Sequence, residues 1–268
     1  MVRAARARLQ VGAGLVADLD WPSYADAHRQ LPYFLLAARL VADAGVRVLL
    51  HGCVGAGPAT TRHGLAALGL PMARTTGEAA EHLETCRLAH LPLELLSGRL
   101  AQLFALKPVL GVRTGVNSVA RELNPAGAPA MLQGVFHPPY IPLHLAAQRM
   151  LGQPRALTFK GGGGEGQRNP DKPCRSMALT AGVEQEVVWP RLNHDAPWPW
   201  REEPLEPSRL AALWRGEWDA PGPVAAVTGT TAMALWLTGR TDDPAVADRL
   251  AAELWVRRDR LRPLPLAA

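Results

Sequence analysis

The sequence has 268 residues, of which 48% are hydrophobic and 20% are charged, and its formal net charge is +5. This composition is typical of a folded domain with a real core and excludes a disordered chain. No run approaches the roughly 18 apolar residues that a membrane helix needs. The cysteines Cys53, Cys86 and Cys174 are too far apart for a disulfide framework or a zinc site and fit a reducing cytoplasm. The basic balance, mostly arginine, favours polyanionic partners.

Apolar periodicity and turn residues predict strands and helices that alternate along the chain. In chain order we expect a helix over 31–45, a strand over 46–50, helices over 61–69 and 78–86, a strand-to-helix passage over 86–96, a helix that breaks at 120–129, a helix over 137–151, a strand over 155–160, and closing helices over 208–218, 226–239 and 244–262. The pattern predicts an α/β fold with a doubly wound, mainly parallel sheet flanked by helices. Ligands of such sheets bind outside the carboxyl ends of the strands. The loops after Leu50 and Phe159 could therefore line one cleft.

The segment FKGGGGEGQRNPDKPCR, residues 159–175, joins glycines to positive charge at the end of a predicted strand. Backbone amides in such a loop can form an anion-binding nest, with cationic side chains around it. The candidate phosphate-binding residues are Lys160, Gly161, Gly162, Gly163, Gly164, Arg168, Lys172 and Arg175. Prolines at 170 and 173 disfavour the helix that a dinucleotide or P-loop motif requires. The alternative is a flexible surface hairpin with solvated charges.

Two further groups of residues are weaker candidates for ligand contacts. Arg113 and Asn117 are four residues apart and would share one face of a helix, and Arg121 would extend that face by one turn. The spacing alone favours an ordinary solvated surface helix over a ligand site. His51 and Gly52 follow a strand, where the imidazole could hydrogen-bond a ligand, although a lone histidine is more often structural. The sequence contains no G-x-S-x-G elbow and no HExxH motif.

Several stretches resemble a known family. They are GVRTGVNSVARELNP at 111–125, LQGVFHPPY at 132–140 and the glycine segment at 159–175. These stretches resemble the large domain of the anthranilate phosphoribosyltransferases, and more closely the paralogues of these enzymes that bind nucleic acid. The stretches at 18–38 and 48–52 fit the same paralogues. The resemblance, from about Asp18 to the C-terminus, implies the α/β fold of this family.

The chain departs from the enzymes of this family where they hold their phosphorylated donor. Their glycine-rich GTGGD segment, which cradles pyrophosphate, is replaced by bulky residues around Trp21-Pro22-Ser23-Tyr24. Their magnesium-binding Asp-Glu pair falls on Gly166 and Gln167. Cys53 replaces the asparagine of their HGN turn, whereas His51, Gly52 and the acceptor-site Arg113 are retained. These retained residues and Asn117 would form a vestigial acceptor pocket.

The family also places a small helical bundle, used for dimerisation, ahead of the α/β domain. We expect residues 1–14 to be a remnant of this bundle and residues 15–268 to form the α/β domain. A homodimer is possible, but the shortened bundle argues against one of the family type.

The lost phosphate cradle and acidic pair lead us to predict a nucleic-acid-binding protein of the cytoplasm with little sequence preference, no cofactor and no membrane partner. Lys160, Arg168, Lys172 and Arg175 would contact backbone phosphates, and Lys107 and Arg113 would extend the basic surface. The alternative is a glycosyl- or phosphoribosyltransferase that uses phosphoribosyl pyrophosphate, with magnesium held by Glu165 or Asp171. A third hypothesis is a remnant without activity.

Overall fold

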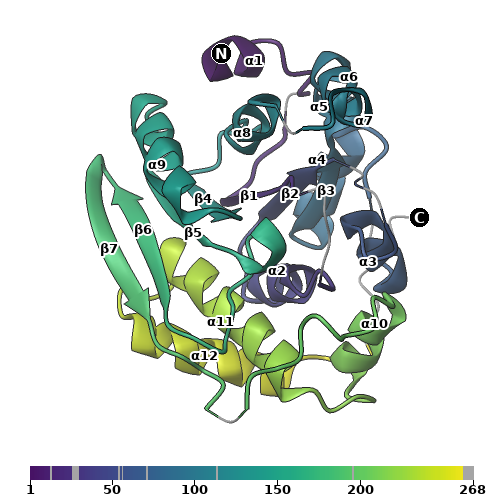
Figure 1. Ribbon diagram of the computed structural model, residues 1–268, viewed down its shortest axis with the longest axis vertical. Helices are drawn as coiled ribbons and strands as arrows, with labels where there is room; N and C mark the ends of the chain where they lie inside the picture. Colours follow the sequence, from purple (N-terminus) through teal and green to yellow (C-terminus); the bar gives the residue numbers. More distant parts are fainter. Residues whose placement is uncertain are drawn as a thin grey trace.

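The computed structural model describes residues 1–12, 14–25, 30–53, 55, 57–70, 72–112, 114–194 and 196–261. Its centre is a seven-stranded sheet with the strand order β3-β2-β1-β4-β5-β6-β7 (Figure 1). The strands are β1 (Leu19–Ser23), β2 (Val48–Gly52), β3 (Leu88–Pro92), β4 (Ala130–Val135), β5 (Arg155–Lys160), β6 (Cys174–Thr180) and β7 (Val183–Trp189). Strands β1 to β5 are parallel, and β6 and β7 continue the sheet in antiparallel pairs.

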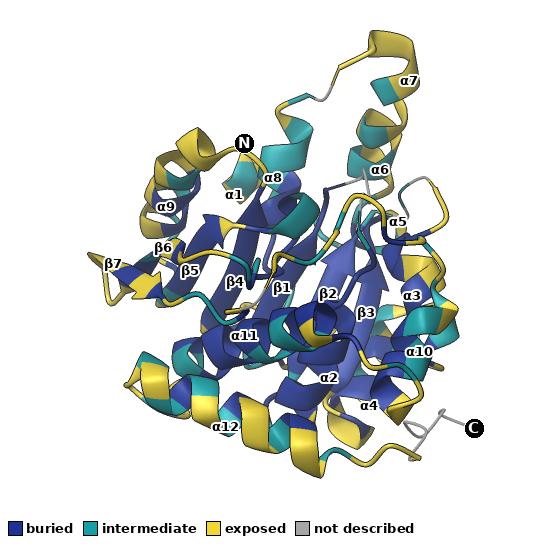
Figure 2. Cartoon of the chain, turned by 60° about the horizontal axis from the view of Figure 1, so that its bottom comes forward, coloured by how far each residue is buried: buried dark blue, intermediate teal, exposed yellow. Residues whose placement is uncertain are grey.

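Helices connect the parallel strands and close the chain. They are α1 (Val2–Arg6), α2 (Phe34–Asp43), α3 (Thr61–Ala67), α4 (Thr76–Thr85), α5 (Leu93–Leu96), α6 (Gly98–Ala105), α7 (Lys107–Leu110), α8 (Val116–Arg121), α9 (Ile141–Met150), α10 (Ser208–Arg215), α11 (Pro221–Leu237) and α12 (Pro244–Arg257). Two short 3₁₀ turns, η1 (Pro138–Tyr140) and η2 (Gly162–Gly164), follow β4 and β5. Helices α6 and α7 extend away from the sheet (Figure 2).

The sheet is buried on both faces because its strands carry apolar residues on each side. In β2, Val48 and Leu50 join the large core beneath α2 and α11, whereas Leu49 joins a second core with residues of α4. This alternation follows from the two-residue period of a strand. Helix α11 packs against α2, α12, β4 and β5, and α9 packs against β5 and β6 on the opposite face (Figure 1). The sheet is therefore the middle layer of three.

The predicted fold class is confirmed. The expected helices and the strands at β2, β3 and β5 are present, and no helix follows the glycine run. We did not predict the hairpin of β6 and β7. Its outer strand exposes most of its side chains, so it lacks the apolar alternation from which strands are recognised. No helix in the described ranges is long and apolar enough to cross a membrane.

Candidate functional site

The strand order creates a topological switch point between β1 and β4. From β1 the chain continues to β2 and β3 on one side, whereas β4 and β5 lie on the other. Parallel sheets leave a crevice outside the carboxyl ends of the strands at such a point. Two cavities open at this edge of the sheet, and Phe136, directly after β4, lines both.

The first cavity, which we call the glycine-loop pocket, has a volume of about 630 Å³. It lies outside the ends of β4 and β5 and is bounded by the start of β6. Lys160, Lys172 and Arg175 bring positive charge to its wall, and Gly161, Gly162 and Gly163 form part of the lining. Arg175 is paired with Glu186 at 2.8 Å. Lys160 and Lys172 make no ion pair within the described part of the chain, which leaves their charges available to an anion.

The glycines of this pocket serve close backbone packing rather than an anion nest. A Cβ at Gly161 would lie 1.6 Å from the carbonyl oxygen of Glu165, and one at Gly134 would lie 2.0 Å from the same oxygen. The loop after β5 therefore folds back over the end of β4 at a distance that only glycine permits. The amides of Gly161, Gly162 and Gly164 donate to backbone carbonyls of this same region. They are not free to bind phosphate, in contrast to the sequence-based expectation.

A buried arginine and a buried glutamate hold this loop in place. Arg121 donates from Nη1 to the carbonyl of Gly134 at 2.8 Å and from Nη2 to that of Gly164 at 3.2 Å. Oε1 of Glu165 accepts from the amide of Ala25 at 2.9 Å, which ties the loop to the chain after β1. Bonds to charged groups are the stronger ones in a protein interior. The loop is thus part of the rigid edge of the sheet.

The second cavity, which we call the β1–β4 pocket, has a volume of about 480 Å³ and lies at the switch point. Its lining combines apolar side chains with groups that can hydrogen-bond a ligand. The apolar and aromatic members are Val135, Phe136, Tyr140 and Leu143, and the polar members include Tyr24, Asn117, Ser118, Arg121, His137 and His144. A cavity of this mixed character suits a small, flat organic molecule that carries a few polar atoms.

Behind one wall of the β1–β4 pocket lies a buried polar chain. The hydroxyl of Tyr24 is 2.9 Å from Nδ1 of His51, and Nε2 of His51 is 3.3 Å from Oδ2 of Asp20. A carboxylate can only accept, so Nε2 carries the proton, Nδ1 accepts, and the phenol donates. Burial raises the pKa of Tyr24 well above its ordinary value and keeps the phenol neutral. His51 is fully buried behind Tyr24 and lines neither pocket.

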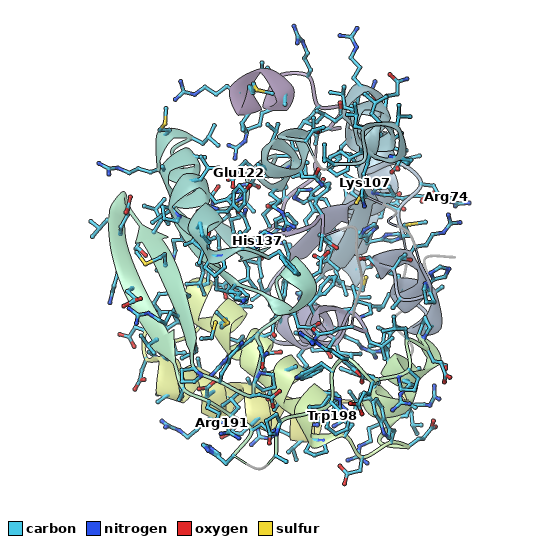
Figure 3. All side chains as sticks on the ribbon, in the orientation of Figure 1. Arg74, Lys107, Glu122, His137, Arg191 and Trp198 are labelled. Carbon is cyan, nitrogen blue, oxygen red and sulfur yellow. The ribbon has the colours of Figure 1, made fainter. Side chains whose placement is uncertain are left out.

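The predicted phosphate-binding residues separate into three groups. Lys160 and Lys172 do lie on one cavity, together with the paired Arg175. Arg168 does not, because it is buried, donates to Oδ1 of Asp248 at 3.0 Å and also bonds the carbonyl of Pro190. Lys107 begins α7, in the part of the chain that extends away from the sheet (Figure 2; labelled in Figure 3), and does not line the glycine-loop pocket.

The predicted acceptor pocket is only partly assembled. Asn117 lines the β1–β4 pocket, whereas Gly52 packs against the backbone of Ser23 and Arg113 lies outside the described residues. No described residue of the loop after β2 lines either pocket, and β1 and β4 lie between β2 and β5 in the sheet.

The residues present do not fit a magnesium site of the family type. In the described ranges, no three His, Cys, Asp or Glu side chains come together in a way that could hold a metal. At Gly166, a Cβ would lie 2.4 Å from Nε1 of the buried Trp21, so the indole fills the space of the expected aspartate. Gln167 is also buried and accepts from the amide of Phe34 at 3.0 Å.

The carboxylates that the sequence offered in their place are used elsewhere. Glu165 accepts from Ala25, as described above, and its other oxygen, Oε2, is buried. Asp171 accepts from the Asn193 side chain at 2.8 Å and from Nε1 of Trp200 at 2.5 Å. Both side chains are structural.

Sequence comparison relates the chain to anthranilate phosphoribosyltransferases. The enzyme of Desulfitobacterium hafniense (strain Y51) is 33% identical over 153 residues, which are 57% of this chain and 46% of that protein. The enzyme of Ralstonia pickettii (strain 12J) is 31% identical over 123 residues, 46% of this chain and 36% of that protein. The chain therefore spans about half the length, or less, of these two curated relatives. No family model matches the chain.

Comparison with solved structures finds that anthranilate phosphoribosyltransferases also share the fold of this chain. The anthranilate phosphoribosyltransferase from Thermus thermophilus superposes with a TM-score of 0.80 over 95% of this chain and 78% of that chain, at 23% identity. The enzyme from Saccharomyces cerevisiae in complex with PRPP and Mg gives a TM-score of 0.74 over 98% of this chain and 76% of that chain, at 15% identity. This chain is anthranilate phosphoribosyltransferase-like in fold and, over part of its length, in sequence.

These findings correct the predicted function in nucleic-acid binding. The relatives and structural neighbours named above are anthranilate phosphoribosyltransferases, and nothing in these comparisons supports the nucleic-acid-binding subgroup. The structure gives a physical reason for the error. Of the side chains predicted to form one basic surface, Arg168 is buried and Lys107 lies on α7, away from the glycine-loop pocket. A transferase is the better supported hypothesis.

Sequence reasoning missed His144, which lines the β1–β4 pocket, and its buried partner Glu122. His144 and Gln148 are four apart in α9 and both face the sheet, on a helix side where apolar residues are the rule. Polar residues at this spacing on a buried helix face are a signal that could have found them.

Proposed function

We propose that the protein is a glycosyltransferase of the phosphoribosyltransferase type, which moves a pentosyl group from a phosphorylated donor to a small acceptor. The observation that carries this proposal is the pair of adjoining pockets at the switch point, which meet at Phe136. One pocket is cationic and the other mixes aromatic and hydrogen-bonding groups. Two unlike substrates can thus be held side by side, and such positioning is a large part of the catalysis of a two-substrate transfer.

The glycine-loop pocket is the donor site in this proposal. Lys160 and Lys172 face the cavity without carboxylate partners in the described ranges, and ammonium groups bind phosphate as point charges. With Trp21 packed against Gly166 and no acidic pair at 166 and 167, we assign no role to a protein-bound metal. Side chains hold the phosphate in this proposal, since the amides of Gly161, Gly162 and Gly164 already donate to backbone carbonyls.

The β1–β4 pocket is the acceptor site. Phe136 and Tyr140 offer flat apolar surfaces, and Asn117 and His144 offer hydrogen-bonding groups. An aromatic amine or acid matches this lining. The similarity to anthranilate phosphoribosyltransferases supports the same chemical class of acceptor.

Donor binding tests the proposal by calorimetry with phosphoribosyl pyrophosphate or ribose 1-phosphate, each with and without Mg²⁺. We expect the wild-type protein to bind one of these donors. The double variant Lys160→Ala/Lys172→Ala should bind that donor at least about tenfold more weakly for each lost contact, because a charge-assisted hydrogen bond contributes about 1.5–3 kcal/mol.

The matched control removes two positive charges elsewhere. Arg74 and Arg149 are exposed and make surface ion pairs with Glu78 and Glu184. The variant Arg74→Ala/Arg149→Ala should therefore bind the donor like wild type. No heat with either donor at millimolar concentration, or equal loss in both double variants, would refute the proposed donor site.

A further inference from the structure

A histidine and a glutamate form a buried pair at the wall of the β1–β4 pocket. Nδ1 of His144, on α9, is 2.7 Å from Oε1 of Glu122, which directly follows α8. Their side chains are 4% and 2% exposed. Figure 3 labels Glu122 in the region of α8 and α9. The pair links an element on one side of the pocket to an element on the other.

The carboxylate fixes which nitrogen of the ring carries a proton. An ionised carboxylate only accepts hydrogen bonds, so Nδ1 of His144 is the donor in this contact. Arg6 donates from Nε to the backbone carbonyl of Glu122 at 2.8 Å, so its guanidinium lies beside this residue. An imidazole whose single proton is on Nδ1 has a bare Nε2.

A row of buried side chains from the sheet also reaches Nδ1 of His144. Oγ1 of Thr158 donates to Oε1 of Gln148 at 3.3 Å, Nε2 of Gln148 donates to Oε1 of Gln133 at 2.7 Å, and Nε2 of Gln133 lies 2.7 Å from Nδ1 of His144. The oxygen and nitrogen of an amide can be exchanged without a change of shape. A protonated Nδ1 requires both glutamine amides to be turned, so that the Gln133 oxygen accepts from Nδ1 and the Gln148 nitrogen donates to Thr158.

The opposite edge of the ring is turned to the pocket. His144 lines the β1–β4 pocket, and its Nε2 makes no hydrogen bond to any residue in the described ranges. The other titratable or charged groups around the pocket are Tyr24, held by His51, Arg121, held by two backbone carbonyls, and the side chains of His137 and Tyr140. No carboxylate lines the cavity among these residues. Among these groups, His144 is the one that contacts a buried carboxylate through Nδ1 and has no hydrogen-bond partner at Nε2 in the described ranges.

We propose that His144 is the general base of the transfer, with Glu122 as its positioning residue, an inference that rests on the proposed function. The nucleophile of the acceptor is the nitrogen of an N–H group or the oxygen of an O–H group. Its lone pair forms a bond to C1 of the pentose while the C1–O bond to the leaving phosphate breaks. The leaving group departs with that bonding pair. The acceptor proton passes to Nε2 of His144 and from there to solvent, so no further reactant is needed.

The pH dependence of turnover tests this role. With anthranilate as acceptor and a fixed donor, wild-type kcat should rise with pH through an acidic limb that reports a histidine. His144→Gln should lower kcat by about 10²–10⁴-fold, the usual contribution of a general base, and abolish that limb while the KM for the donor stays unchanged. His63→Gln, on the exposed surface of α3, serves as the matched control and should behave like wild type. Retention of the limb in His144→Gln, or an effect on KM alone, would overturn the assignment.

Nitrogen-15 NMR of the imidazoles gives a readout that does not need turnover. The His144 signal, assigned by its loss in His144→Gln, should show a protonated Nδ1 and a bare Nε2, and anthranilate should shift the Nε2 resonance. Glu122→Gln should mix the two tautomers. If the wild-type protein transfers a pentosyl group from neither donor, the proposed function fails. The nitrogen-15 spectrum alone then tests the inference about His144. A bare Nε2 that responds to anthranilate retains His144 as a proton acceptor of this pocket, whereas a protonated or unresponsive Nε2 overturns the inference.

Discussion

Arg168 and Arg175 belong to one sequence segment and carry the same charge, but their environments differ. The Arg168 side chain has no exposed surface and pairs with Asp248 of α12, whereas the Arg175 side chain is 75% exposed and pairs with Glu186 of β7. Burial lowers the pKa of Arg168 and raises the pKa of Asp248, and the charge of each opposes the shift of the other. The buried pair is therefore balanced only while both partners are present.

This difference predicts the stability of two matched variants. Arg168→Ala leaves the Asp248 carboxylate without its partner in the interior and should reduce the free energy of unfolding by about 3–5 kcal/mol. Arg175→Ala removes a surface ion pair and should change it by no more than about 1 kcal/mol. Urea unfolding followed by circular dichroism measures both. Equal effects of the two substitutions would show that Arg168 is not buried as described.

The sequence could not distinguish these two arginines. The partner of Arg168 lies 80 positions away in the chain, and only the docking of α12 on α11 brings it near. The alternation of charge and glycine in the segment is equally compatible with a solvated loop. Burial of a charged residue depends on long-range contacts that a local pattern does not contain.

At the scale of elements, the glycine loop is a packing device between the ends of β4 and β5. Gly161→Ala would place a Cβ 1.6 Å from the Glu165 carbonyl oxygen, a backbone atom that cannot move aside without displacing the loop. We expect a loss of about 1–3 kcal/mol or more in the free energy of unfolding, as in other overpacked sites, together with weaker donor binding. Thermal unfolding and the calorimetric titration measure the two effects.

The control for this substitution is Gly98→Ala. Gly98 begins α6, a Cβ there would have no neighbour within 4 Å, and its φ is not in the left-handed region. Alanine favours a helix over glycine, so this variant should be at least as stable as wild type. If both alanine variants unfold like wild type, the close approach at Gly161 is not present.

Elements were easier to predict than their contacts. The helix over 31–45 and the strands at β2 and β5 have strong periodic patterns and clear ends, and they were predicted from these. The glycine run was correctly placed at the end of a strand without a following helix, but it was interpreted as an anion nest. Glycine in a sequence indicates close approach or an unusual φ, and the sequence does not say whether a ligand or the chain itself approaches.

For the whole molecule, the strand order decides which loops meet. Because β1 and β4 are neighbours, Tyr24 and Phe136 come together at the switch point and the two pockets adjoin there. The sequence predicted a doubly wound sheet, but not the order of its strands, so it did not predict the pocket between β1 and β4. The site that results has two adjoining compartments that meet at Phe136.

The most direct test of this account is turnover. Purified protein is incubated with phosphoribosyl pyrophosphate or ribose 1-phosphate and anthranilate, with and without Mg²⁺, and the mixture is analysed by liquid chromatography and mass spectrometry for the pentosyl-anthranilate product. We predict a product that requires both substrates and is strongly reduced in the Lys160→Ala/Lys172→Ala variant. A folded wild-type protein that forms no product from either donor under any of these conditions would contradict the assignment of the two pockets as donor and acceptor sites.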